Sequence, residues 1–351
     1  MAINAYKHGA ISEPTYCLKR LGFICNEEAI CERLLTAAGH QGPFKLTPIV
    51  GGRNNKVSRV QRGEHSFLLK SFFHSADDPR DRYGAETRFY EFVDRNQIAQ
   101  TPKLAATSHN DKAILMEFIE GSRVRPEDIG PNEFRAAFDF AIALNSNVSG
   151  VSRLSAASEA CFSLSAYCDL LDNRITRLAN LTSDTAALKF IHQELVPKWS
   201  ATREQLCPAD TRNADFDLLN SERVVSPSDF GFHNCIRQQD GSLIFYDFEY
   251  AGLDDPAKLI CDFFCQVDVP VPATFLDEAL DEFGRHLDRR EALEIRVRTL
   301  MPIIQLKWCC ILLNEFLDTD AARRTFAGSS ANAAAREYQL TKARDALRQV
   351  N

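Results

Sequence analysis

Short apolar runs separated by turn residues occupy the chain between residues 46 and 118. Their length and composition predict five strands, over residues 46–50, 56–60, 66–73, 102–107 and 113–118. Residues 81–93, between the third and fourth runs, instead carry apolar side chains at helical spacing. This part of the chain therefore predicts a small sheet with one helix between its strands.

Apolar residues at three- and four-residue spacing fill most of the chain after residue 121. This pattern predicts helices over residues 132–145, 155–181, 185–205, 275–286, 293–316 and 332–350. Ahead of the strands, Asn26 is a good N-cap for a further helix, and Gly39 can end it. Packing against the fold is the default role for this first helix, because the sequence gives no sign of another.

The overall composition narrows the class of protein. The chain has 351 residues, 45% of them apolar and 25% charged, which fits a globular protein of two domains or lobes. A net charge of −7 argues against a nucleic-acid partner, since general binding to phosphate backbones needs a basic surface.

The cysteines and the apolar runs indicate the cellular compartment in which the protein is expected. No apolar run is long enough to span a bilayer, and the first residues have no apolar signal core, so we expect a soluble protein with no membrane partner. The eleven cysteines include no Cys-x-x-Cys pair. Buried thiols in a reducing compartment explain them better than disulfides or zinc, and a cytoplasmic location is therefore expected.

Residues that could take part in catalysis or bind a metal ion are concentrated between residues 226 and 262. Asp229 and Asn234 lie on an expected loop, and an apolar strand then leads to Asp247, with a hairpin turn over residues 239–241 in between. Two carboxylates and a carboxamide at a hairpin suit phosphoryl transfer from a magnesium nucleotide. One acid accepts the proton of an attacking hydroxyl, and the other holds Mg²⁺ with the amide oxygen. From these residues alone, ordinary turn residues are an equally good reading of Asp229 and Asn234.

The same residues resemble a known family, the aminoglycoside phosphotransferase and choline kinase-like group. Asp229, Asn234 and Asp247 match its catalytic Asp, its Asn and its metal-binding Asp, and residues 247–256 resemble its Asp-aromatic-Glu-Tyr-Ala-Gly…Asp-Pro segment. The resemblance implies that Asp229 is catalytic and that Asn234 and Asp247 bind magnesium. One departure is Pro227, which stands where the group commonly has a His that packs the loop.

The resemblance covers about residues 46–320 and implies a fold. The group shares the two-lobed protein-kinase fold, so we expect an α+β protein with a five-stranded antiparallel sheet in its N-terminal lobe and a mainly helical C-terminal lobe. The implied organisation is a helical extension over residues 1–45, a small nucleotide-binding lobe over residues 46–120, and a helical lobe with the catalytic and metal-binding loops over residues 121–351.

Lys70 lies in the middle of a strongly apolar strand, where an unpaired charge costs several kcal/mol. The resemblance identifies it with the lysine that contacts the nucleotide phosphates and implies an acidic partner on the next helix. We choose Glu86 as this partner and keep Glu91 in reserve. Without the downstream motif, an edge-strand lysine that faces water is the preferred reading.

Two further segments are expected to bind the nucleotide. Gly51, Gly52, Asn54 and Asn55 lie between the first two strands, and such residues let main-chain amides curl toward an anion. By itself this segment reads more readily as a plain hairpin, and only its position favours nucleotide binding.

The second segment follows the fifth strand and resembles the hinge between the lobes. The resemblance implies that the backbone groups of Glu117 and Ile119 hydrogen-bond the adenine and that Met116 lines its pocket. As an isolated stretch it reads as a buried strand and a turn.

Three other residues have two readings each. Asp262 matches an acid that anchors the catalytic loop of kinase-like folds, or it is a helix N-terminal acid. Trp308 borders a substrate cleft or, more often for such a residue, belongs to the core. His233 is adjacent to Asn234, but we expect it to be a loop residue without a catalytic role.

The expected function is transfer of the γ-phosphate of ATP, with Mg²⁺ as cofactor, to a hydroxyl of a small molecule such as an aminoglycoside, amino alcohol or sugar. The alternative is a catalytically silent nucleotide-binding scaffold. A protein-substrate kinase is disfavoured because residues 247–256 leave little room for a peptide-docking segment. The identity of the acceptor and the choice between ATP and GTP stay open, as does the choice between a monomer and a homodimer.

Overall fold

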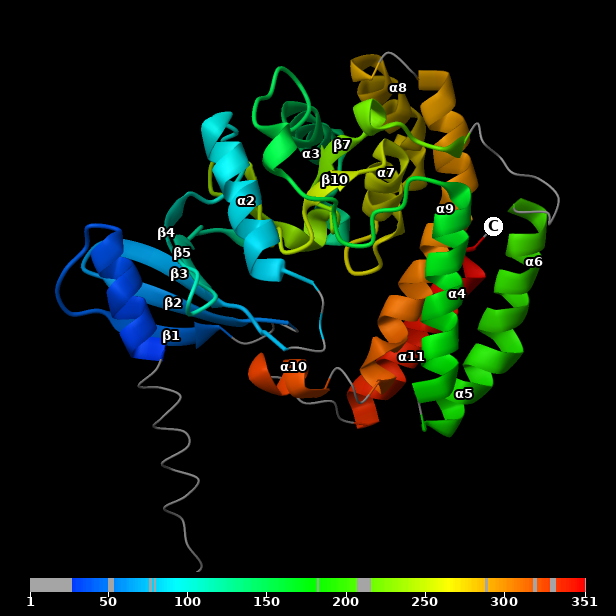
Figure 1. The fold of residues 1–351 in the computed structure, drawn as a ribbon, viewed down its shortest axis with the longest axis horizontal. Coiled ribbons are helices and arrows are strands. Elements are labelled where there is room, and N and C mark those ends of the chain that lie inside the picture. Colours follow the sequence, from blue (N-terminus) through cyan, green and yellow to red (C-terminus); the bar gives the residue numbers. More distant parts are fainter. Residues whose placement is uncertain are drawn as a thin grey trace, which may run out of the picture.

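The structure of the protein is a computed structural model, shown in Figure 1. It describes residues 27–49, 54–75, 78, 80–181, 183–206, 216–287, 290–317, 321–328 and 333–350. A β-rich part lies at one end of the molecule and a helical part at the other, and their elements follow one another along the chain as the apolar patterns predict (Figure 1).

The β-rich part is built on one antiparallel sheet of five strands in the order β1-β2-β3-β5-β4. The strands are β1 (Lys45–Ile49), β2 (Lys56–Arg62), β3 (His65–Ser71), β4 (Leu104–Ser108) and β5 (Ala113–Glu117). The helix expected between the third and fourth strands is α2 (Arg82–Arg95), and the side chain of Asp81 caps its first turn. The expected five-stranded antiparallel sheet is therefore confirmed.

A helix over residues 27–37 covers the face of the sheet opposite α2. Its apolar residues Ile30, Leu34 and Leu35 share a cluster with Phe67 and Leu115 of the sheet. The chain then turns at Gly39, whose φ of +81° suits a residue without a Cβ. The expected packing role of this helix is confirmed for residues 27–37.

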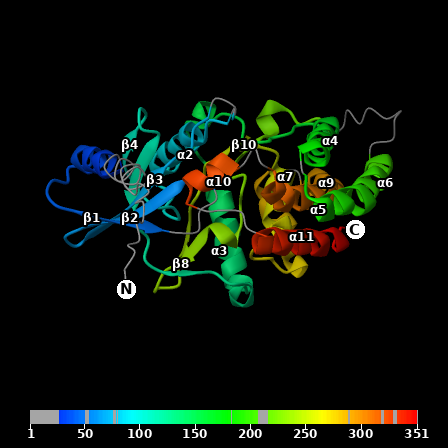
Figure 2. The same cartoon turned by 90° about the horizontal axis from the view of Figure 1, so that it is seen from below.

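The helical part contains most of the remaining elements, which are α3 (Pro131–Ala143), α4 (Leu164–Leu181), α5 (Thr185–Phe190), α6 (Val196–Leu206), α7 (Pro256–Cys265), α8 (Leu276–His286), α9 (Arg290–Leu313), α10 (Ala321–Phe326) and α11 (Ala333–Arg348). A π-helical turn (Ile191–Leu195) joins α5 to α6. The long helix α9 packs against α4, α7, α8 and α11, so it forms the centre of this part (Figure 2). Within the described residues, no helix is long and apolar enough to span a membrane.

The helix expected over residues 155–181 begins later than predicted. Ser155 and Ala157 instead exchange main-chain hydrogen bonds with Leu253, at 2.8 and 2.9 Å, and Ser163 caps the first turn of α4. Helical spacing of apolar residues does not reveal this non-local pairing, so the prediction of the helix start was wrong.

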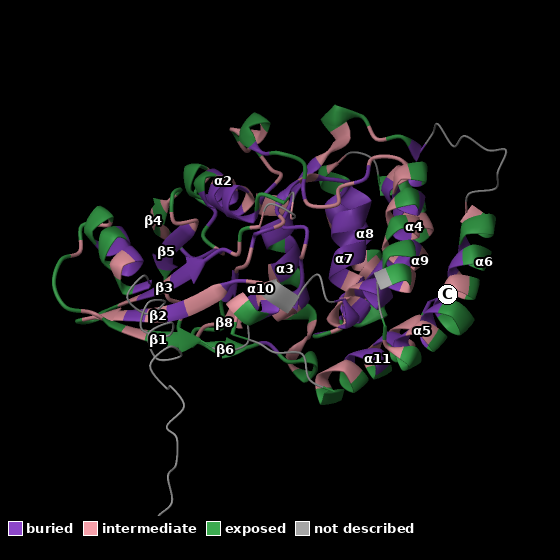
Figure 3. Ribbon diagram, turned by 60° about the horizontal axis from the view of Figure 1, so that its bottom comes forward, coloured by how far each residue is buried: buried purple, intermediate pink, exposed green. Residues whose placement is uncertain are grey.

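Two small sheets hold the loops that bear Asp229, Asn234 and Asp247. The expected hairpin consists of β8 (Cys235–Arg237) and β9 (Leu243–Phe245), and β6 (Ser122–Arg123) pairs with β8. A second pair joins β7 (Val224–Ser226) to β10 (Gly252–Asp254). Strands β7 and β9 are fully buried, whereas β6, labelled in Figure 3, is exposed. Phe140 of α3 stacks on Phe245 of β9 with ring centroids 4.8 Å apart, so the hairpin is fixed to the helical core.

Candidate functional site

Lys70 lies at the centre of a group of three charges, of which Lys70 and Glu86 are buried. Its Nζ lies 2.5 Å from Glu86 Oε2 on α2 and 2.6 Å from Asp247 Oδ1, just after β9. Only 5% of Lys70 and 1% of Glu86 is exposed, whereas Glu91 faces solvent. β3 pairs with a strand on each side, so the reading of Lys70 as an edge-strand residue is wrong. The structure thus brings together the expected lysine, its chosen partner and Asp247.

Burial and charge act in opposite directions on the pKa values of this group. Burial raises the pKa of Glu86 to about 7, against the opposing effect of the Lys70 ammonium. Burial by itself would lower the pKa of Lys70, but the carboxylates of Asp247 and Glu86 raise that pKa well above its ordinary value. Lys70 is consequently a cation at any physiological pH.

Asp229 and Asn234 lie together on the loop between β7 and β8. Asn234 Nδ2 donates to the main-chain oxygen of Asp229 at 3.0 Å and lies 3.3 Å from its Oδ2. Tyr246 N donates to Asn234 O at 3.0 Å, and the pairing of β8 with β9 holds this loop beside the segment that bears Asp247. The three residues that the sequence singled out are therefore neighbours at one end of the hairpin.

His233 contacts the carboxylate of Asp229, which the sequence had not indicated. Its Nε2 lies 3.2 Å from Asp229 Oδ1, and its ring edge faces Trp308 with centroids 6.3 Å apart. Burial works to raise the pKa of Asp229, but the neighbouring imidazole lowers it below its ordinary value, and Asp229 in turn raises the pKa of His233. A Cβ on Gly231 would lie 2.8 Å from His233 Nδ1, so only glycine leaves room for the imidazole there.

Two residues of the site have left-handed backbone conformations without being glycine. Ser228, immediately before Asp229, has a φ of +64°, and Asp247 has a φ of +68°. Such conformations cost on the order of 1 kcal/mol each, and they persist where the surroundings impose them. The backbone is thus strained at Asp247 and at the residue immediately before Asp229.

A buried network supports the loop where Pro227 stands. Lys258 Nζ lies 2.6 Å from Asp254 Oδ2, 2.9 Å from Asp262 Oδ2 and 3.0 Å from Ser228 Oγ. Lys307 Nζ of α9 contacts the other oxygen of Asp262 at 2.9 Å. Burial raises the pKa of Asp254 to about 6, despite the opposing charge of Lys258. Lys258 thus connects the loop to α7 through Ser228.

The two expectations for Asp262 meet different outcomes. It lies within α7, whose N-cap is Asp255, so the reading as a helix N-terminal acid is wrong. Its carboxylate binds the ammonium groups of Lys258 and Lys307. Asp262 is therefore connected to the loop that bears Asp229 through Lys258, which contacts Ser228. Trp308 is 8% exposed and belongs to the main hydrophobic cluster, as the more frequent reading expected.

The asparagines between β1 and β2 contact the helical part. The side chains of Asn54 and Asn55 both donate to the carboxylate of Glu249, two residues after Asp247. Gly51 and Gly52, which were expected in the same nucleotide segment, lie outside the described residues.

The segment that was expected to form a hinge begins within β5, which ends at Glu117. Met116 is 3% exposed on the inner face of the sheet, where Tyr90 Oη donates to its Sδ at 3.6 Å. Glu117 N donates to Lys103 O at 2.8 Å, so this amide is used within the β-rich part. No main-chain hydrogen bond joins Ile119 to another described residue.

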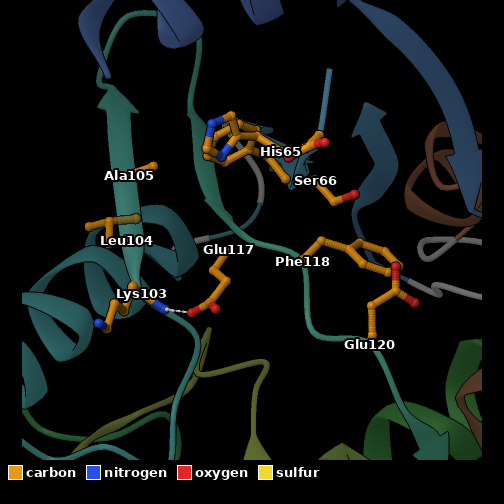
Figure 4. A pocket seen from close by; sticks show the side chains of 10 residues that line it. His65, Ser66, Lys103, Leu104, Ala105, Glu117, Phe118 and Glu120 are labelled. Carbon is orange, nitrogen blue, oxygen red and sulfur yellow. Dashed lines mark hydrogen bonds between the residues drawn. The ribbon is translucent and has the colours of Figure 1, made fainter. Parts of the chain in front are cut away.

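A groove of about 460 Å³ lies beside this hinge (Figure 4). Its lining includes His65, Phe67, Lys103, Glu117 and Glu120. Phe67 packs with the helix over residues 27–37, whereas Leu104 of the same lining packs against the cluster on the other face of the sheet. Neither Lys70 nor Met116 belongs to the lining of the groove.

Sequence reasoning left Glu249 and Lys258 without a role. Lys258 lies among apolar residues in the sequence, as Lys70 does, and a search for such charges would have found it. Glu249 belongs to the segment quoted for the family resemblance, but nothing in the sequence indicates that its partners lie nearly two hundred residues earlier.

Comparison with known proteins gives a consistent picture. The model of a family described as "Phosphotransferase enzyme family" matches residues 45–296. No curated protein matches the chain in sequence. Among solved structures, the choline kinase of Cryptosporidium parvum Iowa II has 13% identity and a TM-score of 0.56, with 92% of this chain and 95% of that chain covered.

Two other solved structures have the same fold. The choline kinase LicA of Streptococcus pneumoniae has 12% identity and a TM-score of 0.58, with 92% of this chain and 98% of that chain covered. The aminoglycoside phosphotransferase APH(2")-IIa in its gentamicin complex has 18% identity and a TM-score of 0.55, with 88% and 92% covered. At such identities the likeness concerns the fold alone, which is the expected α+β fold of the kinase-like proteins.

Proposed function

Because the chain belongs to the phosphotransferase enzyme family, we propose that it transfers the γ-phosphate of ATP to a hydroxyl group of a small molecule. The contact of Lys70 with both Glu86 and Asp247 is the observation that carries this proposal. In it, residues 46–120 form the nucleotide-binding lobe, and residues 121–351 form the lobe that holds the catalytic and metal-binding loops.

In this proposal the nucleotide binds on the inner face of the five-stranded sheet. Lys70, a permanent cation held by Glu86, contacts the α- and β-phosphates. Met116 lines the adenine pocket, and backbone groups of Glu117 and Ile119 hydrogen-bond the base. The lack of a main-chain partner for Ile119 among the described residues supports its part in this role.

Asn234 and Asp247 are the proposed magnesium ligands. Carboxylate and amide oxygens are the donors that Mg²⁺ prefers. Asn234 uses its amide nitrogen on Asp229, which leaves its side-chain oxygen available, and 38% of the Asp247 side chain is exposed. Both observations fit a metal site. When bound, the metal ion neutralises charge on the transferring phosphate oxygens.

Asp229 is the proposed catalytic residue. Its carboxylate is 31% exposed, and its lowered pKa keeps it ionised at neutral pH. It orients the acceptor hydroxyl and takes its proton as the bond to phosphorus forms. The donors His233 and Asn234 hold the carboxylate in one orientation while it does so.

The test compares variants of the two acids. We expect Asp229→Ala to lower phosphate transfer by at least about 100-fold while Mg·ATP still binds, because the base acts only in the chemical step. Asp247→Ala should weaken magnesium-dependent nucleotide binding instead. Asp240→Ala is the matched control, since this exposed aspartate of the hairpin turn contacts only Ser242 in the described structure, and its transfer rate should be unchanged.

The wild-type acceptor is found by screening. Transfer from labelled ATP or GTP is measured against amino alcohols, aminoglycosides, sugars and other hydroxylated metabolites. Full turnover by Asp229→Ala would contradict its proposed role. Tight Mg·ATP binding without transfer to any acceptor would favour the silent scaffold instead.

A further inference from the structure

Glu249 is a buried carboxylate for which the proposed reaction has no use. It is 3% exposed and follows Asp247 by two positions. Asn55 Nδ2 donates to its Oε2 at 2.5 Å, and Asn54 Nδ2 donates to its Oε1. Both oxygens of the carboxylate therefore accept from the segment between β1 and β2.

The surroundings of Glu249 compensate its charge. Arg82, the first residue of α2, is 2% exposed, and its Nε lies 3.9 Å from Glu249 Oε2. A buried carboxylate without donors or a counter-ion costs several kcal/mol, so two amides and a guanidinium are what make this position tolerable. The contact of Glu249 with the two asparagines is therefore buried and charge-compensated, unlike an ion pair on the surface.

The contact also determines where the two asparagine side chains point. Asn54 Nδ2 has a second partner in Tyr250 Oη at 2.9 Å, and Asn55 Oδ1 accepts from Phe73 N at 3.4 Å. The side-chain nitrogens of both asparagines are thus bound to the helical part, and Asn55 Oδ1 is bound to Phe73, which follows β3. The main-chain amides at this position are not engaged by Glu249.

We propose that Glu249 is a positioning residue for the nucleotide. By holding the side chains of Asn54 and Asn55, it fixes these two residues relative to Asp247, and thereby sets the distance between their main chain and the magnesium site of the proposed function. The inference rests on the nucleotide-binding half of the proposed function and does not depend on the acceptor.

The expected consequence concerns affinity rather than the chemical step. Loss of the contact frees the side chains of Asn54 and Asn55, so part of the binding free energy of the nucleotide must be spent on fixing these two residues. We expect Glu249→Gln, which keeps the volume but removes the charge, to raise the Kd of Mg·ATP by about tenfold or more, the change that corresponds to one net hydrogen bond. The kcat at saturating ATP should change much less than the Kd.

A double-mutant cycle tests the pathway of the effect. The Kd of Mg·ATP is measured by calorimetry for the wild type, Glu249→Gln, Asn55→Ala and the double variant. If Glu249 acts through Asn55, the double variant should bind no more weakly than the weaker single variant. Glu91→Gln, an exposed carboxylate on α2, is the matched control and should bind as the wild type does.

Each outcome has a distinct meaning. A Glu249→Gln protein that loses thermal stability but keeps its Kd would overturn the inference, because a purely structural role predicts that result. The inference would also be overturned if the effects of the two substitutions on the Kd were fully additive and Glu249→Gln alone changed the Mg²⁺ requirement. That result would indicate that Glu249 is a metal ligand. If Glu249→Gln does not fold, Asn54→Ala and Asn55→Ala carry the test, and unchanged Kd values in both refute the inference.

The proposed function fails separately. A wild-type protein that binds no Mg·ATP overturns both proposals. A wild-type protein that binds Mg·ATP but transfers no phosphate overturns only the transfer reaction, and the cycle then still decides the role of Glu249.

Discussion

Replacement of Lys70 by Met removes the one cation that contacts both Glu86 and Asp247. Methionine retains the length of the side chain, so the change mainly removes charge. Glu86 is 1% exposed and cannot turn to water, whereas the Asp247 side chain is 38% exposed and can. The consequence for stability therefore falls on Glu86.

The magnitude follows from the geometry. At 2.5 Å and an effective dielectric constant of about 20, the attraction between Lys70 and Glu86 is about 7 kcal/mol before the cost of removing both groups from water is subtracted. Removing one partner of a buried pair costs about 3–5 kcal/mol, because the other charge is left uncompensated. Because the folded pKa of Glu86 is about 7, we expect the loss in the free energy of unfolding of Lys70→Met to be smaller than this near pH 7 and to approach it as the pH is raised and Glu86 ionises.

The loss should depend on pH in a defined direction. In the wild type, burial raises the pKa of Glu86 to about 7, and Lys70 opposes the increase. Without Lys70 the pKa rises further above its unfolded value. A raised folded pKa gives stability that is present at low pH and lost as the pH rises through it, by up to about 1.4 kcal/mol per pH unit. The gap between wild type and variant should therefore widen as the pH is raised above about 7.

Urea unfolding followed by circular dichroism at pH 6, 7 and 8 measures this gap. Lys342→Met is the matched control: Lys342 pairs with Asp268, whose side chain is 54% exposed, so we expect a loss below about 1 kcal/mol without a pH trend. Adding Glu86→Gln to Lys70→Met should recover part of the stability. A loss below about 1 kcal/mol that does not change with pH would refute the reasoning.

Two further predictions concern other charged contacts. Lys258→Met should lower the free energy of unfolding by about 3–5 kcal/mol, because it leaves the buried Asp254 without its counter-ion and Asp262 with Lys307 as its remaining described counter-ion; denaturant titration measures this. A loss below about 1 kcal/mol would contradict the support of the loop through Ser228. Asp111→Asn tests how the first helix is attached to the sheet. The Ser108 hydroxyl and the Arg33 guanidinium lower the pKa of Asp111 in the folded protein. The contribution of Asp111 to the free energy of unfolding, below about 1 kcal/mol, is therefore present above its unfolded pKa of about 4 and is lost as the pH falls through the folded pKa. Thermal unfolding of this variant and the wild type between pH 2 and pH 7 measures the difference, and equal stabilities across that range would argue against the contact.

Local patterns were enough to predict most of the elements. The strands around Lys70 and the hairpin before Asp247 follow from apolar runs and turn residues that lie within a few positions of one another. The resemblance of residues 247–256 to a segment of a known family indicated which side chains are candidates for the functional site. The prediction failed where distant residues intervene, as at Ser155 and Ala157, which pair with Leu253 instead of starting a helix.

The sequence by itself determined the order of strands and helices, and it marked Lys70, Asp229, Asn234 and Asp247, because periodicity and a charge within an apolar run are local properties. Only the tertiary structure decided which groups meet. Glu249 reaches Asn54 and Asn55 across nearly two hundred residues, and the backbone of a short loop brings His233 onto Asp229. Such contacts depend on how separate elements pack and on which buried charges need a partner, and no spacing along the chain records either.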